Sequence, residues 1–504
     1  MMTRPPLRHS RLVLGAALSL LAACALAGGA APKAAPSPTL DKKQLTALMQ
    51  QELAGKGLRG ADVGVALFDL VSREMVFAHN ADRLLAVASN NKLVTTAAAL
   101  ELLGADFQFR TSVAAVGKMQ GDGTLKGDLL VIGRGDPNIS GRFHDGKTTA
   151  VLEGWAKAVA AAGIKTVRGD IVADDSYFDR QYTHPDWPEP YTAWYRAGVC
   201  ALSLNDSCVD IIVRPSSKSG NLAIVTTDPA TSYVRVANTC RTSRSGNRVI
   251  IHRLRGRNQI NVSGTIHHRR GPQRSSITIH DPARYTATVF REVLQAKGIK
   301  VAGLVRLRPT DYRFRPDEYH EIVTTTSSLA DSVAVANTNS QNFYAEQMLK
   351  TLGREKQGKG SFIAGAAAVA AFLREAGVRG VFAYADGSGL GRNNRFTPRQ
   401  ITALLAYMNC RRTGSLYWHS LAQPGQTGTL RRRSLLLPLQ GRLAAKTGYI
   451  NGVSALSGYV ETLGGRLLAF SVLVNGFRGG LTACRIAQDR ICLHASRYAP
   501  KRAE

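Results

Sequence analysis

Apolar positions near the start of the chain alternate between helical and strand-like spacing. A helix before Gly55 is predicted by apolar residues three and four positions apart: Leu45, Leu48, Met49 and Leu53. Val63–Leu70 and Glu74–Ala78 have the pattern of two strands joined by a turn. The Ala- and Leu-rich run 93–100, which stops near Gly104, predicts a buried helix.

From about residue 110 the pattern becomes β-rich. Strands are predicted at Thr111–Val116, Leu129–Ile132 and Thr166–Ala173, and one helix at Val151–Ala162. Residues 210–310 are predicted to be mostly β, with alternating stretches at 248–251 and 276–279. Gly133–Pro137 is interpreted as a turn, because it lacks the third glycine and the helix of a dinucleotide-binding loop.

After Ile322 the helical spacing returns. Helices are predicted at Asn342–Leu352, Phe362–Glu375 and Pro398–Met408. Three strands and a last helix follow: Leu443–Lys446, Ser454–Val460, Arg466–Val474 and Ala483–Tyr498. We therefore expect an α/β (α+β) domain built from residues 41–109 and 320–504. Residues 110–319 would be a β-rich insertion that forms one or two further domains.

Length and charge narrow the class of protein. The chain has 504 residues, 44% of them apolar, which is too long for one ordinary core and predicts two or three domains. Lys and Arg number 65 against 36 Asp and Glu, so the formal net charge is +29. Such an excess favours a polyanionic partner: nucleic acid, an anionic membrane surface or an acidic wall polymer.

The N-terminus has the features of an export signal. Arg4, Arg8 and Arg11 precede an apolar run, and we expect residues 1–27 to be a signal peptide and 28–40 a flexible leader. The signal could end in either of two ways. Ala25–Ala27 would be a cleavage site that releases a soluble protein, whereas Leu21–Cys24 resembles a lipobox that would anchor Cys24 to lipid. Export to the periplasm or cell envelope makes nucleic acid an unexpected partner.

Export also affects how the cysteines are interpreted. Six follow Cys24, at positions 200, 208, 240, 410, 484 and 492. Their grouping suggests one disulfide among the first three and another among the last three. No spacing fits a zinc site, and we expect no metal.

A basic stretch in the β-rich middle admits two interpretations. It includes six arginines: Arg253, Arg255, Arg257, Arg269, Arg270 and Arg274. They could line a solvated face of a sheet, or they could form an electrostatic surface toward anionic wall polymer.

Ser89 and Lys92 are the first candidates for chemistry. They are three residues apart at the start of the predicted buried helix, so their side chains share one face. An amine made neutral by burial could take the proton of the serine. Alone, the pair could equally be a helix-capping serine and a solvated lysine.

Two further motifs lie in the last third of the chain. Ser340-Gln341-Asn342 stands at a predicted helix start and Lys446-Thr447-Gly448 at the end of a predicted strand. Each alone could be structural, Ser340 as a helix cap and residues 446–448 as a strand ending. All three motifs, in this order, match the set S-x-x-K, S-D-N and K-T-G of penicillin-binding proteins and class A β-lactamases, with Gln341 at the variable middle position of the second motif.

The chain from about residue 45 to 495 resembles the class C low-molecular-mass penicillin-binding proteins, which are D-alanyl-D-alanine carboxypeptidases/endopeptidases. Their hallmark is a long insertion between the first two motifs. Further matching segments are 125–128, 135–137, 201–205, Asp386–Leu390, Gly428–Leu430 and 453–459. The resemblance implies a penicillin-binding/β-lactamase-like transpeptidase domain, with helices flanking an antiparallel sheet. It also implies peptidoglycan stem peptides as substrates, β-lactam antibiotics as covalent inhibitors, and no cofactor.

The resemblance assigns roles to the motif residues. Ser89 would attack the D-Ala-D-Ala bond and form an acyl-enzyme, with Lys92, crowded by Lys446, as the base. Ser340 would pass the proton to the leaving amine, and Asn342 would position the peptide.

The third motif would bind the substrate. Lys446 and Thr447 would hold the terminal carboxylate, and the backbone N–H groups of Ser89 and Tyr449, beside Gly448, would form the oxyanion hole. Tyr449 stands where the family usually has Ser or Thr. We therefore expect a contact from its backbone N–H group but not from a side-chain hydroxyl.

Two substrate-binding positions carry over less directly. Arg392 matches an arginine expected near a free carboxylate of the stem peptide, although Gly391 replaces the usual Ser beside it. Asp174, with Asp175 adjacent, matches an acidic contact to a diamino-acid side chain. A surface arginine in a loop is the alternative for Arg392.

Three other functions remain open. A β-lactamase would use the same motifs but does not need so large an insertion. A non-catalytic wall-binding protein could retain the fold, although the intact motifs oppose this. An exported polyanion-binding protein would rest on charge alone.

Overall fold

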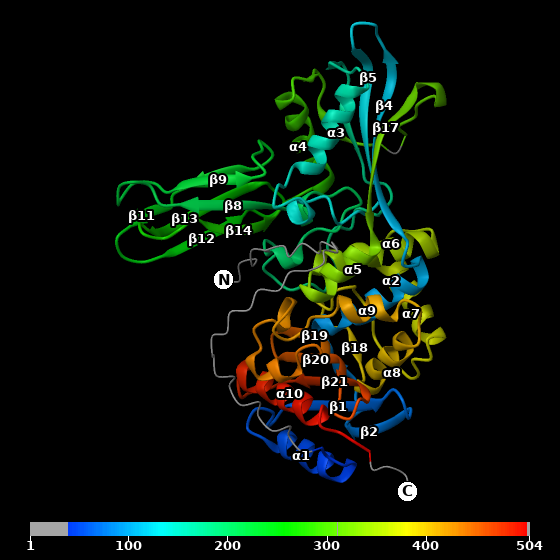
Figure 1. Cartoon of the computed structure of the whole chain (residues 1–504). Coiled ribbons are helices and arrows are strands. Elements are labelled where there is room, and N and C mark those ends of the chain that lie inside the picture. Colours follow the sequence, from blue (N-terminus) through cyan, green and yellow to red (C-terminus); the bar gives the residue numbers. More distant parts are fainter. Residues whose placement is uncertain (1–38, 310, 501–504) are drawn as a thin grey trace, which may run out of the picture.

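The computed structural model describes residues 39–309 and 311–500, and Figure 1 shows the whole chain. The predicted signal peptide, Cys24 and all of the leader before residue 39 lie outside the described residues. A lower part holds the first and last segments of the chain, and an upper part holds the middle, from which a β-rich arm projects sideways (Figure 1).

A five-stranded antiparallel sheet joins the two ends of the chain. Its order is β19 (Leu443–Ile450), β20 (Val453–Glu461), β21 (Leu467–Asn475), β1 (Asp62–Asp69) and β2 (Glu74–His79). Side chains alternate between its faces, so that along β21 Phe470 and Val472 belong to one core and Ala469 and Leu473 to another. The sheet thereby supports a separate helical layer on each face.

Helices cover both faces of this sheet. α1 (Lys42–Ala54) and α10 (Leu481–Ala495) pack on one face, and α8 (Pro398–Asn409) packs on the other. Beyond α8 lies α2 (Asn91–Leu103), buried on all sides from residue 91 to 100. It is surrounded by α5 (Leu329–Thr338), α6 (Asn342–Gln357), α7 (Phe362–Glu375) and α9 (Gly414–Ser420). A two-stranded ladder, β3 (Leu85–Ala86) with β18 (Arg395–Phe396), lies before α2.

A second sheet forms the upper part. β4 (Gln108–Met119) leaves α2 and pairs with β5 (Thr124–Gly133), and the chain returns to α5 through β17 (Tyr319–Ser328), which also pairs with β4. The short strands β6 (Thr166–Val167), β7 (Ile171–Asp174), β15 (Lys300–Val301) and β16 (Val305–Leu307) complete it. α3 (Ala150–Ala161) and α4 (Pro282–Ala296) pack against the sheet. We propose from this pairing that the inserted part spans residues 108–328.

The arm contains two smaller sheets (Figure 1). One has the order β14 (Gln273–Thr278), β8 (Cys208–Arg214), β9 (Ile224–Asp228). In the other, β13 (Gln259–His267) pairs with β10 (Arg235–Asn238), β11 (Arg241–Ser243) and β12 (Arg248–Arg253). Apolar side chains of the arm share one core with the upper sheet.

Three structural expectations need correction. α4 lies in the region predicted to be mostly β, where no helix was named, although Ala283, Ala287, Phe290 and Leu294 have helical spacing. β19 continues through the third motif to Ile450, because residues 446–450 pair with β20. The predicted strand 166–173 is divided into β6 and β7.

The expected disulfides are absent among the described thiols. Cys200 and Cys240 belong to the core of the upper part, and Cys484 and Cys492 to the core beneath the five-stranded sheet. Each behaves as a small apolar side chain, and burial raises the pKa of the Cys200 and Cys492 thiols. Cys410 is exposed and is also not bridged.

Candidate active site

Ser89 lies in a short 3₁₀ turn, Ala88–Asn90, that leads directly into α2. The preceding residue, Ala88, has φ of 45°, a left-handed conformation that is strained for a residue other than glycine. One turn later, Lys92 Nζ lies 3.0 Å from Ser89 Oγ. The structure thus brings the first two predicted residues together, as the spacing required.

Lys92 is completely buried among polar groups. Besides Ser89, its Nζ contacts Asn342 Oδ1 at 2.7 Å and the carbonyl oxygen of Ser388 at 2.8 Å. Burial lowers the pKa of Lys92 to about 7, while the charges of Glu346 and Asp386 act to raise it. The pKa of Lys92 is therefore lowered by desolvation and not, as expected, by the charge of Lys446.

A second buried lysine lies on β19. Lys446 Nζ donates to Ser340 Oγ and to the carbonyl oxygen of Thr447, both at 2.8 Å. Burial and then the charge of Lys92 lower its pKa well below the usual value. Ser340 is not a helix cap, because α6 has Gln341 at its N-cap position with no side-chain bond. With φ of 58°, Ser340 is a second strained residue at this site.

The third motif passes very close to the serine. A Cβ on Gly448 would lie 2.8 Å from the carbonyl oxygen of Val87 and 3.2 Å from the backbone nitrogen of Ser89. Glycine is needed for this approach of β19 to the 3₁₀ turn. Beside it, Thr447 Oγ1 contacts Thr429 Oγ1 at 2.8 Å, and the Tyr449 side chain is exposed.

Asn90 fastens the turn to the sheet. In the amide orientation that satisfies its neighbours, its nitrogen donates to the carbonyl oxygen of Lys446 at 2.8 Å. Its oxygen then accepts from the hydroxyl of Ser457 on β20 at 2.7 Å. A fully buried side chain therefore fixes Ser89 relative to β19.

Two buried carboxylates, Glu346 and Asp386, had no assigned role and interact electrostatically with Lys92. Both oxygens of Glu346 on α6 accept backbone N–H bonds at 2.8 Å, from Gly387 and from Ser388. Asp386 accepts from the backbone nitrogens of Gly389 and Gly391, each at 2.7 Å. Burial, followed by the charge of Asp386, raises the pKa of Glu346. In the sequence, the match of segment 386–390 to the family pointed to this loop. No feature of the sequence pointed to Glu346.

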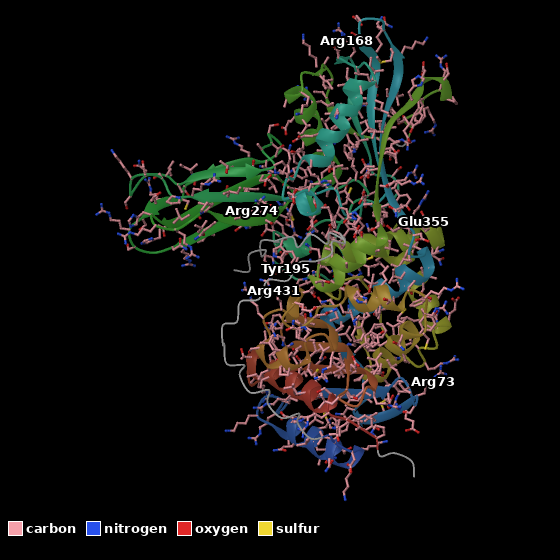
Figure 2. All side chains as sticks on the ribbon, in the orientation of Figure 1. Arg73, Arg168, Tyr195, Arg274, Glu355 and Arg431 are labelled. Carbon is pink, nitrogen blue, oxygen red and sulfur yellow. The ribbon has the colours of Figure 1, made fainter. Side chains whose placement is uncertain are left out.

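The inserted part also reaches the site. Asn342 Nδ2 donates to the carbonyl oxygen of Tyr195 at 2.8 Å. Tyr195 belongs to a segment of the upper part, and Figure 2 shows it at the junction with the lower part. Both ends of the Asn342 amide therefore have protein partners, Lys92 and Tyr195.

The two weaker predictions lie apart from this cluster. Arg392 is exposed and donates to the carbonyl oxygen of Asn451, in the turn that follows Tyr449, at 2.8 Å. Asp174 lies on β7, buried, with an ion pair to Arg308 at 2.9 Å. Among the described contacts, neither residue touches Ser89 or Lys92.

Across residues 39–309 and 311–500, His, Cys, Asp and Glu side chains nowhere gather in threes suited to a metal ion. Within the same residues, each helix is too short or too polar to cross a membrane.

A protein-family comparison matches residues 43–496 to the D-Ala-D-Ala carboxypeptidase 3 (S13) family. The chain belongs to this family. A D-alanyl-D-alanine carboxypeptidase of an Actinomadura species is 33% identical over 490 residues, covering 94% of this chain and 88% of the relative. The carboxypeptidase DacB of Haemophilus influenzae is 25% identical over 441 residues, covering 85% of this chain and 88% of the relative.

Solved structures match the same fold. Penicillin binding protein 4 of H. influenzae has a TM-score of 0.77 at 22% identity, covering 90% of this chain and 99% of that one. The structure of that protein complexed with a β-lactam has a TM-score of 0.71 at 23% identity, covering 89% and 99%. The expected fold class is confirmed, and the chain is a peptidase of the penicillin-binding class.

The close approach at Gly448 can be tested by adding one methyl group. We expect Gly448→Ala to lower the free energy of unfolding by about 1–3 kcal/mol, because its Cβ would press on the backbone at Val87. Gly154→Ala on α3 is the control, because its Cβ would meet nothing within 4 Å and Ala favours helix. Thermal and denaturant unfolding would measure both, and equal stability of Gly448→Ala and parent would contradict the packing argument.

Proposed function

We propose that this chain is an exported serine-type carboxypeptidase/endopeptidase that cleaves the D-Ala-D-Ala end or cross-links of peptidoglycan stem peptides through an acyl-enzyme at Ser89. The observation that carries the assignment is the 3.0 Å contact between Ser89 Oγ and a fully buried Lys92 whose pKa is lowered to about 7. Family membership supports the reaction class.

The contacts of Lys92 suit a base. A charged ammonium has three N–H donors, whereas a neutral amine has two donors and one lone pair. Asn342 Oδ1 and the Ser388 carbonyl oxygen are acceptors only and would take the two N–H bonds of neutral Lys92. The lone pair would then face the hydroxyl of Ser89. Lys92 would accept that proton as Ser89 Oγ attacks the scissile carbonyl carbon.

Backbone N–H groups would stabilise the oxyanion. The tight approach of Gly448 brings β19 against the backbone nitrogen of Ser89. The N–H groups of Ser89 and Tyr449 are the donors we assign to the oxyanion hole, fixed in place by β19 and the 3₁₀ turn. Because these donors are backbone groups, the tyrosine side chain at position 449 does not disturb them.

Lys446 and Ser340 would complete the reaction. Their 2.8 Å hydrogen bond joins the second lysine to a hydroxyl that can pass a proton to the leaving amine. A substrate carboxylate beside Lys446 would favour its ammonium form, which burial and the charge of Lys92 disfavour. Thr447 would donate to the same carboxylate. Water would then hydrolyse the ester, and a β-lactam would acylate Ser89 in the same way.

Export and substrate are inferred together. A peptidase of cell-wall peptides acts outside the cytoplasm, which agrees with the signal pattern at residues 1–27. We place the mature protein in the periplasm or cell envelope. Cleavage before Cys24 would leave it anchored to lipid through that cysteine, whereas cleavage after Ala27 would release it. The intact arrangement of Ser89, Lys92 and Lys446 favours this peptidase over a non-catalytic wall-binding protein.

Labelling with a fluorescent penicillin tests the nucleophile. We expect a stable covalent label on the parent, none on Ser89→Ala, and labelling slowed by about 10²–10⁴-fold in Lys92→Ala. Ser415→Ala, an exposed serine on α9, is the matched control and should label normally. A folded parent that remains unlabelled would refute the proposal, and rapid loss of the label would instead favour a β-lactamase.

The pH dependence of acylation tests the role of Lys92. The acylation rate should rise with pH through about 7, as Lys92 loses its proton. The Glu346 carboxylate raises the pKa of Lys92, so Glu346→Gln should lower that pKa and move the rise to lower pH. Glu355→Gln, an exposed acid on the same helix, should leave the profile in place. A shift to higher pH in Glu346→Gln would contradict the assignment.

Carboxylate recognition tests carboxypeptidase specificity. Thr447→Val retains the shape of the side chain but removes its hydroxyl group. We expect KM for a peptide ending in free D-Ala-D-Ala to rise by about tenfold, since one charge-assisted hydrogen bond is lost. KM for the C-terminal amide of the same peptide should change little. Equal effects on both peptides would argue against carboxylate contact at Thr447.

A further inference from the structure

The charge of the arm is unusually one-sided. Residues 229–280 include ten arginines and no Asp, Glu or Lys. Solubility alone is served equally well by lysine, whereas arginine presents a planar fork of donors that fits phosphate. This composition therefore favours recognition of phosphate over general hydration.

Most of these arginines lack an acidic partner. Among the ten, the described contacts include an ion pair only for Arg274, which binds Asp210 and Asp228. Arg253 is buried against the Tyr191 ring and is structural. The remaining eight are exposed: Arg235, Arg241, Arg244, Arg248, Arg255, Arg257, Arg269 and Arg270. The arm thus presents many cations that the protein itself does not neutralise.

Part of this charge gathers around a hollow. A depression of about 630 Å³ on the arm is lined by Lys218, Arg244, His268 and Arg269, together with the hydroxyl-bearing Ser217 and Ser219. Slight desolvation and then the charges of His267, Arg269 and Arg244 lower the pKa of His268. Cations and hydroxyl donors around a hollow, with no carboxylate in the lining, are the groups that bind a phosphate.

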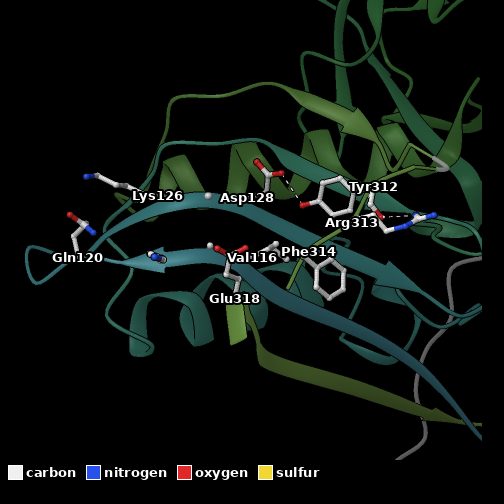
Figure 3. A pocket seen from close by; sticks show the side chains of 11 residues that line it. Val116, Gln120, Lys126, Asp128, Tyr312, Arg313, Phe314 and Glu318 are labelled. Carbon is white, nitrogen blue, oxygen red and sulfur yellow. Dashed lines mark hydrogen bonds between the residues drawn. The ribbon is translucent and has the colours of Figure 1, made fainter. Parts of the chain in front are cut away.

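A second hollow offers a contrast. It has about 470 Å³ and lies on β4 and β5, with Asp128, Tyr312 and Phe314 in its lining (Figure 3). Asp128 is bound there by Arg306 at 2.9 Å and by the Tyr312 hydroxyl at 2.9 Å. Glu318 adds another acid to this lining. Its charges are mixed and partly paired, so it lacks the uniform cationic character of the hollow on the arm.

We propose that the arm binds a linear polyanion with repeating phosphodiester groups, and that one phosphate occupies the hollow formed by Lys218, Arg244, His268 and Arg269. This site lies outside the catalytic cluster and goes beyond the proposed peptidase function. It would hold the enzyme on a phosphate-bearing polymer while the lower part acts on peptides.

The spread of the cations favours a polymer over a single phosphate. Arg244 and Arg269 lie at one end of the paired strands β12 and β13, and Arg255 and Arg257 lie in the turn at the other end. The six residues of β12 separate the two ends by roughly 17 Å. Several phosphates in sequence could contact both ends, whereas one phosphate could not.

The same spread argues against a flat membrane surface. In Figure 2 nitrogen atoms project from the upper edge, the lower edge and the tip of the arm. A bilayer would meet only one of these faces, while a flexible polymer can follow several. Exposed aromatic side chains, which anchor proteins at membrane interfaces, are also missing from the exposed large apolar residues of the arm: Leu222, Ile224 and Ile250.

Binding of fluorescent poly(glycerol phosphate) to the purified mature chain tests the proposal. We expect anisotropy to report salt-sensitive binding, weakened about tenfold or more in the triple variant Lys218→Ser/Arg244→Ser/Arg269→Ser. The control triple variant, Lys43→Ser/Lys56→Ser/Arg59→Ser, removes the same charge from exposed positions on and after α1 and should bind like the parent. Penicillin labelling should be unchanged in both variants.

Further binding measurements distinguish between the possible sources of the phosphate group. Inorganic phosphate should bind far more weakly than the polymer, and anionic phosphatidylglycerol vesicles should not outcompete it. The NMR-measured pKa of His268 should rise when the polymer binds, because anions favour the imidazolium form. The proposal is overturned if the arm variant binds like the parent, if phosphate or vesicles bind as tightly as the polymer, or if the pKa of His268 does not rise.

Discussion

Lys92 and Lys446 are both removed from water, and the surrounding structure must stabilise two amines in a place that disfavours their charge. Burial lowers the pKa of each, which leaves Lys92 ready to accept a proton near neutral pH. Glu346 and Asp386 oppose this for Lys92 and keep its pKa from falling further. The reactivity of the site therefore depends on a balance between desolvation and buried carboxylates.

The fold creates this balance by bringing together three segments that are distant in the sequence. α2 supplies Lys92, the loop before α6 supplies Ser340, and β19 supplies Lys446. Asn90 bonds the 3₁₀ turn to β19 and β20, which fixes the position of the nucleophile relative to the third motif. The two strained residues, Ala88 and Ser340, each lie beside such a contact: Ala88 precedes Ser89 and Asn90, and Ser340 Oγ accepts from Lys446.

The insertion contributes to the site as well as extending from it. The carbonyl of Tyr195 accepts from Asn342, whose other amide atom contacts Lys92, so the upper part helps to orient the base. The arm carries an excess of arginine and projects sideways from the upper part (Figure 1). Chemistry in the lower part and the attachment that we propose for the arm would be separate functions of one chain.

The sequence by itself determined the three motifs, the family resemblance and most helix and strand positions, because these depend on local spacing. α7, for example, spans the predicted residues 362–375. α4 was also missed, although the helical spacing of Ala283, Ala287, Phe290 and Leu294 is a local signal. The sequence could not reveal the free state of Cys200 and Cys484 or the role of Glu346, because each depends on neighbours that are distant in the chain. Only the tertiary structure decided how deeply the lysines are buried, and burial is what sets the pKa of Lys92.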